Sequence, residues 1–146
     1  MIEVTLKGAN SLIKELRDLP EGLEDKVILG LSQVAFDSAQ KGAGKHFKTG
    51  ALFQSLYNRK VLGGGRAVGH DPARAPHALF VVFGTRPHVI KPKKRKALRW
   101  VGPNGFIFAK SVNHPGYRGD NYMLRARDDA LGQFKAITDN ALKRSL

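Results

Sequence analysis

The sequence predicts a single α+β domain of 146 residues, and three observations point to this class. Apolar residues recur at helical spacing early in the chain and again near its end. Between these two stretches lie short β-like segments separated by glycine and proline. The 42% apolar and 25% charged residues are typical of a globular chain, which at this length buries enough surface to fold without disulfides. We therefore expect a long N-terminal helix, a small antiparallel sheet and a long C-terminal helix packed on the sheet.

The first strand and helices are predicted from alternating apolar and polar side chains, from helix-capping residues and from proline. Residues 2–7 alternate apolar and polar side chains, which predicts a short strand. Asn10 or Ser11 is expected to cap a short helix that stops at Pro20, and Pro20 is expected to be the first residue of the long helix. That helix carries its apolar repeat at Leu23, Val27, Leu31 and Val34. It should end near Gly42 and Gly44, and residues 50–57 should form a second, shorter helix.

The middle of the chain predicts mostly strands. Residues 57–62 and 66–70 flank three glycines and predict a β-hairpin. The apolar segment 77–85 fits either a strand or two helical turns. Three further β-like segments are 88–92, 96–102 and 106–112, followed by a loop over 113–120. Asp120 or Asn121 is expected to cap the final helix, which should run almost to the end of the chain.

Charge is concentrated in the middle of the chain. The net charge is +13, and residues 38–127 hold 18 lysines and arginines against two acids, Asp71 and Asp120. Such a field attracts polyanions or an acidic protein neighbour, although a solvated basic face without a ligand is also consistent with it. The absence of cysteine excludes disulfides, thiolate metal sites and cysteine nucleophiles. Without a signal-peptide pattern or an apolar run near ~20 residues, we expect a soluble protein kept in a reducing cytoplasm.

Two groups of residues suggest phosphate binding or catalysis, and each also has a simpler structural interpretation. The segment GAGKHFKTG resembles a phosphate-binding loop, but Lys45 is followed by His46 and Ala39 occupies the required glycine position, so a flexible helix end is favoured. No histidine pair has zinc-helix spacing, and we expect no metal, cofactor or catalytic residue. A cluster of His77, His88 and His114 among basic residues could still cleave RNA by acid–base catalysis. A basic ribonuclease-like toxin is therefore the enzymatic alternative.

The run KPKKRK is the densest basic segment, and its proline predicts an extended, solvated loop or strand edge. Candidates for contact with DNA or with an acidic partner are Lys91, Lys93, Lys94, Arg95, Lys96 and Arg99. Trp100, Phe106 and Phe108 follow closely, and they are expected either to stack on nucleic-acid bases or to lie in the core. A free-standing, non-specific nucleic-acid-binding protein is a further alternative.

Two sequence segments carry a resemblance to a known family. FGTRPHVIKPKKRKALRW and, about ten residues later, KSVNHPGYRGDNYMLRA resemble the tail-component family of lambdoid siphophages, the neck or head–tail joining proteins of the HK-type phages. The first segment matches at Phe83, Gly84, Thr85, Pro87, His88, Pro92, Lys93, Lys96, Ala97, Leu98 and Trp100. The second matches at His114, Pro115, Gly116, Tyr122, Met123 and Ala126. MIEVTLKGANSLIKELRDLP and KTGALFQSLY are also similar to the family's opening segments.

The resemblance implies a structural virion protein that joins head and tail without catalysis. Such proteins assemble as rings, expected here to be hexameric, around the DNA channel and bind neighbouring head–tail connector and tail proteins. The expected location is the neck or tail of a phage or prophage virion assembled in the bacterial cytoplasm. This chain departs from the family at Val82, where relatives often have an acid, and at Asp120 and Asn121, where a proline is usual. We also expect the FGT turn and the HPG turn to lie close together, with structural roles for Gly84, Thr85, Pro87, His88, His114, Pro115 and Gly116.

Overall fold

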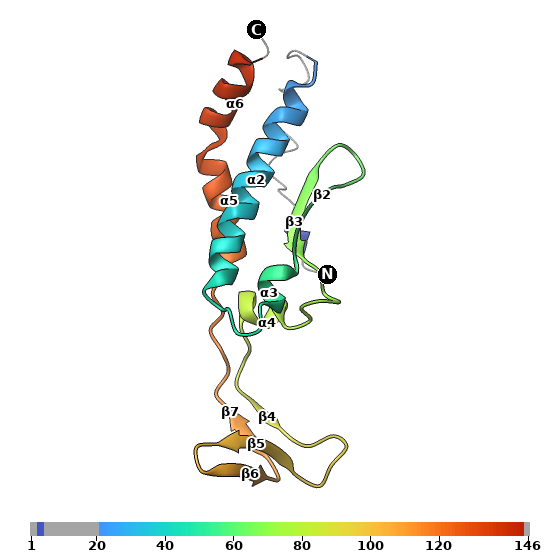
Figure 1. Ribbon diagram of the computed structural model, residues 1–146, viewed down its shortest axis with the longest axis vertical. Helices are drawn as coiled ribbons and strands as arrows, with labels where there is room; N and C mark the ends of the chain where they lie inside the picture. Colours follow the sequence, from blue (N-terminus) through green and yellow to red (C-terminus); the bar gives the residue numbers. More distant parts are fainter. Residues whose placement is uncertain (1–2, 5–20, 145–146) are drawn as a thin grey trace.

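The computed structural model describes residues 3–4 and 21–144 and confirms the α+β class (Figure 1). A body of helices and a small sheet occupies one end of the molecule, and a β arm projects from the other end. Strand β1 (Glu3–Val4) lies within the strand predicted over residues 2–7. The short helix predicted from Asn10 or Ser11 to Pro20 lies outside the described residues.

The long helix predicted in the N-terminal part of the chain is α2 (Leu23–Gly44). It begins after Gly22, whose left-handed φ of 79° turns the chain, so the helix starts later than the predicted Pro20. The apolar repeat lies on one face, and Leu23, Val27 and Leu31 are buried. The predicted end near Gly42 and Gly44 is confirmed, and the GAGKHFKTG segment is the end of this helix and the turn after it.

The predicted hairpin is confirmed as β2 (Leu56–Lys60) and β3 (Arg66–His70). Strand β3 is central in an antiparallel β1–β3–β2 sheet, with Leu56 opposite His70 and Val4 opposite Val68. The helix predicted over residues 50–57 is shorter than expected, because α3 (Ala51–Gln54) ends before Leu56 enters β2. Pairing with β3 thus overrides the local helical pattern of its last two residues.

The single final helix predicted from the sequence is instead two helices, α5 (Tyr122–Gly132) and α6 (Phe134–Lys143). They are separated at Gln133, directly after Gly132, a residue with poor helix propensity. Both helices pack against α2, and α5 also contacts β1. Two glycines of α2 permit this approach: a Cβ on Gly42 would lie 2.4 Å from the Tyr122 Cβ, and one on Gly30 would lie 2.7 Å from the Ile137 Cγ2.

The core lies between α2, α5 and the adjoining sheet. Segment 77–85, which fits either a strand or a helix by sequence, forms helix α4 (Ala78–Phe83). Its residues Ala78 and Val82 are part of this core. The remaining large buried side chains come mainly from α2 and α5. They include Leu23, Val27, Leu31, Tyr122 and Met123.

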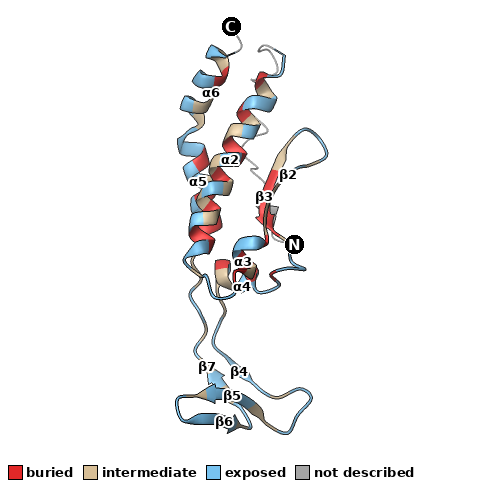
Figure 2. Ribbon diagram, in the orientation of Figure 1, coloured by how far each residue is buried: buried red, intermediate tan, exposed pale blue. Residues whose placement is uncertain are grey.

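The β arm consists of residues 84–119 and holds the last four strands, β4 (His88–Ile90), β5 (Leu98–Gly102), β6 (Gly105–Ala109) and β7 (Val112–His114). The segment predicted as one strand over 106–112 divides at Lys110 and Ser111, and β7 includes two residues that were predicted as loop. Strand β4 pairs with β7 and β5 pairs with β6, so the strands form three small sheets where one was expected. Figure 2 shows that the arm is mostly exposed whereas the body has a buried core.

Candidate assembly surface on the β arm

The arm leaves and rejoins the body through a close contact between two turns. Thr85 and Tyr117 exchange backbone hydrogen bonds, with N···O distances of 2.7 and 2.9 Å. Gly84 has a φ of 82°, and a Cβ there would lie 2.1 Å from the Tyr117 carbonyl oxygen. A Cβ on Gly116 would lie 2.6 Å from the Thr85 carbonyl oxygen. The FGT and HPG turns are therefore adjacent, as expected from the sequence. Only glycine can occupy the two positions, 84 and 116, at which their backbones approach most closely.

The returning chain is also attached to α4. The backbone N–H groups of Asp120 and Asn121 donate to the carbonyl oxygens of Val81 and Val82, at 3.0 and 2.9 Å. Val82 is fully buried, which explains why an acidic side chain would be unfavourable at this position. Asn121 stands at the start of α5 in a left-handed conformation with a φ of 54°, but its side chain makes no capping hydrogen bond. The predicted location of the cap is confirmed, whereas its predicted hydrogen bond is absent.

Two of the three candidate histidines meet at the base of the arm. His88 and His114 are directly opposite each other in the β4–β7 pair, and their rings stack with centroids 5.0 Å apart. The His88 Nδ1 lies 2.8 Å from the Arg86 carbonyl oxygen, which can only accept a hydrogen bond, so this nitrogen carries a proton. The His114 Nδ1 accepts from the Gly116 N–H at 3.0 Å. His77 does not join them and lies at the start of α4.

The outer hairpin of the arm, β5–β6, exposes a row of apolar side chains. Its register places Val101 opposite Phe106 and Arg99 opposite Phe108, all on one face, which we call the apolar face. Val101 is 76% exposed, Phe106 58% and Phe108 65%. The Arg99 guanidinium lies 4.4 Å from the centre of the Phe106 ring. Trp100, on the opposite face, is also exposed, so the expectation that these aromatics lie in a core is wrong for the isolated chain.

The basic run forms an exposed loop between β4 and β5, as predicted for KPKKRK. We call residues 91–97 the basic loop. Arg99 is separate from it, on the apolar face of the hairpin. Residues 84–119 contain nine lysines and arginines and no aspartate or glutamate. The arm therefore combines exposed apolar side chains with an unbalanced positive charge.

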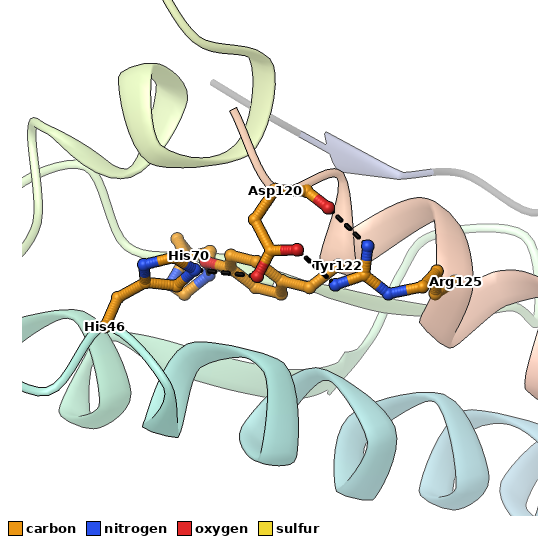
Figure 3. A network of polar contacts seen from close by, with 5 residues as sticks. All are labelled: His46, His70, Asp120, Tyr122 and Arg125. Atoms are coloured by element: carbon orange, nitrogen blue, oxygen red, sulfur yellow. Dashed lines mark hydrogen bonds and ion pairs between the residues drawn. The ribbon is translucent and has the colours of Figure 1, made fainter. Parts of the chain in front are cut away.

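Three buried side chains of the body form a series of hydrogen bonds that the sequence analysis did not predict. The Ser55 Oγ donates to the Leu52 carbonyl oxygen at 2.7 Å, so it accepts from the His70 Nδ1, also at 2.7 Å. The Tyr122 hydroxyl then donates to the His70 Nε2 at 2.6 Å, and Figure 3 shows these two rings together. Burial lowers the pKa of His70 to about 4 and raises that of Tyr122 above its ordinary value, so both groups are neutral.

An ion-paired cluster lies next to these three side chains (Figure 3). The Asp120 carboxylate accepts from the His46 Nε2 at 2.7 Å and also from the Arg125 guanidinium. The hydrogen bond from His46, and then that from Arg125, holds the pKa of Asp120 below its ordinary value. The cluster joins the end of α2, the returning arm and the first turns of α5. Its members come from distant positions in the sequence, and no local pattern signals that they would meet.

No group of three or more histidine, aspartate and glutamate side chains that could hold a metal ion occurs in the described part of the chain. Across residues 3–4 and 21–144, no helix has both the length and the apolar composition needed to cross a membrane. Comparison of the chain with protein-family models, curated proteins and solved structures found no match.

Proposed function

We propose that this chain is a structural virion protein of a tailed phage or prophage, a neck or tail-completion component that joins head and tail as a ring around the DNA channel. The role requires self-association and contacts with other head–tail connector and tail proteins, and it requires no cofactor or catalysis. The ordered resemblance of residues 80–126 to siphophage tail components supports the family assignment. The observation that carries the proposal is the projecting arm with its exposed apolar face.

The apolar face has the composition of a protein interface. An isolated two-stranded hairpin is marginally stable in water, and large exposed apolar patches on soluble proteins mark interaction sites. Aromatic residues and arginine are enriched at protein–protein interfaces, and this face offers Phe106, Phe108 and Arg99. A second chain that covers the face would bury the two phenylalanines and stabilise the hairpin. The arm is therefore suited to contact between subunits.

The position of the arm also suits a ring. The arm projects away from the body of its own subunit, so it can reach a neighbouring subunit (Figure 1). Contact of the arm with a different surface on the neighbour is a heterologous interface, and repetition of such a contact closes into a ring when the rotation permits it. Contact of one arm with another is disfavoured because each carries nine lysines and arginines without an acid.

Light scattering over a concentration series, in low and high salt, tests self-association, and electron microscopy of any large species shows whether rings are present. We expect closed rings, with hexamers as the expected size. A monomer under every condition would refute ring formation by the chain alone. Assays of nucleic-acid binding and RNA cleavage would then decide between the alternatives.

A double variant tests whether the apolar face makes the subunit contact. Phe106→Ser with Phe108→Ser should weaken association by about a thousand-fold, since buried aromatic contacts at interfaces contribute about 2 kcal/mol each, or about 4 kcal/mol together. The matched control is Leu62→Ser, which changes a fully exposed apolar residue in the β2–β3 turn of the body. Association that is equally weakened in both proteins, or in neither, would contradict the role of the apolar face.

The histidine pair favours one alternative, a ribonuclease-like activity. In its neutral form, the His88 Nε2 can accept a proton because Nδ1 carries one. RNA cleavage needs a neutral imidazole as base and an imidazolium as acid, and His114 would supply the acid when it is protonated. This hypothesis predicts RNA cleavage by the purified chain that is lost in His88→Gln and in His114→Gln. The absence of cleavage by the folded parent protein would reject it.

A further inference from the structure

We infer that the basic loop, residues 91–97, is a binding site for the phosphate backbone of nucleic acid, next to the protein-binding apolar face and meeting it at Arg99. The inference rests on the proposed function, which places the protein around a DNA channel. Its test is nevertheless independent, because binding to nucleic acid and assembly of subunits are measured separately.

The first argument is local charge. Lys91, Lys93, Lys94, Arg95 and Lys96 lie within six positions, and every one of these side chains is exposed. The nearest acids along the chain are Asp71 and Asp120, both in the body. Without a carboxylate in the arm to neutralise them, these cations repel one another, and a polyanion would relieve this repulsion. The loop is therefore an electrostatic site that lacks its counter-charge within the arm.

The second argument is shape. The basic loop borders an open hollow of about 610 Å³ next to the first residues of β5. Its lining includes Lys93, Lys94, Arg95 and Lys96, and the hollow meets the apolar face at Arg99 and Phe108. Cations that line one hollow can contact phosphate oxygens simultaneously. The hollow thus groups positive charges in the way that binding to a nucleic-acid backbone requires.

The third argument separates nucleic acid from an acidic protein as the partner. Lysine is depleted at protein–protein interfaces, where arginine and aromatic residues are enriched. The basic loop contains four lysines and one arginine, whereas the apolar face contains an arginine and two phenylalanines. Lysine contacts phosphate as a point charge and needs no fixed geometry, which suits non-specific backbone binding. The two surfaces of the arm therefore differ in composition in the way expected for two different partners.

The number of cations sets the expected salt dependence. If Arg99 and the five cations of the basic loop each contact a phosphate of duplex DNA, the slope of log K against log[salt] is about −5, from roughly −0.9 per contact. Raising the salt from about 50 to about 200 mM would then lower the affinity by about a thousand-fold. Removal of four of the cations would reduce this loss to about ten-fold.

The experiment measures fluorescence anisotropy of a labelled duplex of mixed sequence at several salt concentrations. One variant combines Lys93→Gln, Lys94→Gln, Arg95→Gln and Lys96→Gln. The matched control removes four exposed lysines of the body by Lys41→Gln, Lys45→Gln, Lys48→Gln and Lys60→Gln, so the net charge of both proteins falls equally. Light scattering at the assay concentration establishes that all three proteins have the same oligomeric state.

We expect the loop variant to flatten the salt slope by about three to four and the control to leave it close to that of the parent. An intermediate variant, Lys93→Gln with Lys94→Gln, should flatten it by about half as much. Equal slopes for the loop variant and the parent, or equal flattening by the control, would overturn the inference. Rings that form without loop-dependent DNA binding would overturn it and leave the proposed function in place.

A further probe identifies the partner. Polyglutamate of similar charge should bind far more weakly than DNA, and equal or tighter binding would overturn the inference in favour of an acidic protein.

Discussion

His70 should make the folded body sensitive to acid. Its ring is buried between the Ser55 hydroxyl and the Tyr122 hydroxyl, and burial lowers its pKa from about 6.5 to about 4. The folded state therefore resists protonation more strongly than the unfolded state does. Stability is complete above the unfolded pKa, falls as the pH drops below about 6.5, and stops falling below about pH 4, where both states bind the proton.

The magnitude follows from the difference between the two pKa values. A difference of about 2.5 units corresponds to roughly 3 kcal/mol lost by pH 4, at about 1.4 kcal/mol per unit. At pH 5 the loss from this residue is about 2 kcal/mol. Because domains are stable by only about 5–15 kcal/mol, the effect should be a large fraction of the total.

Urea unfolding measured at several pH values by helical circular dichroism tests this prediction, since the helices of the described residues lie in the body. The comparison is between the parent and His70→Gln, whose amide can replace both hydrogen bonds without titrating. The free energy of unfolding should depend less steeply on pH in the variant, by up to about 1.4 kcal/mol per unit between pH 4.5 and 6. His88→Gln, which changes a histidine of the arm and not of the body, is the matched control. The same slope in the parent and in His70→Gln would refute the reasoning.

Two further predictions concern glycines at close contacts, and melting temperatures check both. Gly84→Val should lower the melting temperature and impair assembly, because it places a side chain at a φ of 82° with its Cβ 2.1 Å from the Tyr117 carbonyl oxygen. A variant as stable as the parent would contradict the close contact between the FGT and HPG turns. Gly42→Ala should destabilise the body by about 1–3 kcal/mol through its clash with Tyr122, whereas Gly44→Ala, in the same helix with open space around it, should be neutral or stabilise by up to about 1 kcal/mol. Equal effects at the two positions would contradict helix packing as the reason for Gly42.

Local patterns predicted those features of the fold that depend on neighbours in the sequence. The apolar repeat of Leu23, Val27 and Leu31 specified the buried face of α2, and three glycines between alternating segments specified the β2–β3 hairpin. The basic loop was also predictable, because its lysines cannot be buried and Pro92 disfavours regular structure. The proximity of the FGT and HPG turns came from the resemblance to a family, since nothing local requires two turns about thirty residues apart to meet.

Long-range packing determined the rest. Whether segment 77–85 was strand or helix depended on the buried site available to Val82, and residues 56–57 left their helical pattern to pair with β3. The network of His46, His70 and Tyr122 joins positions that no local pattern relates.

The aromatic residues of the arm illustrate this limit most clearly. Alternation of Phe106, Ile107 and Phe108 specifies a strand with an apolar face, and the sequence determined this much by itself. The same alternation occurs in a strand on a core and in a strand whose face is covered only by another molecule. Only the tertiary structure decided between them, because it holds the hairpin away from the body and leaves the apolar face exposed among the residues it describes.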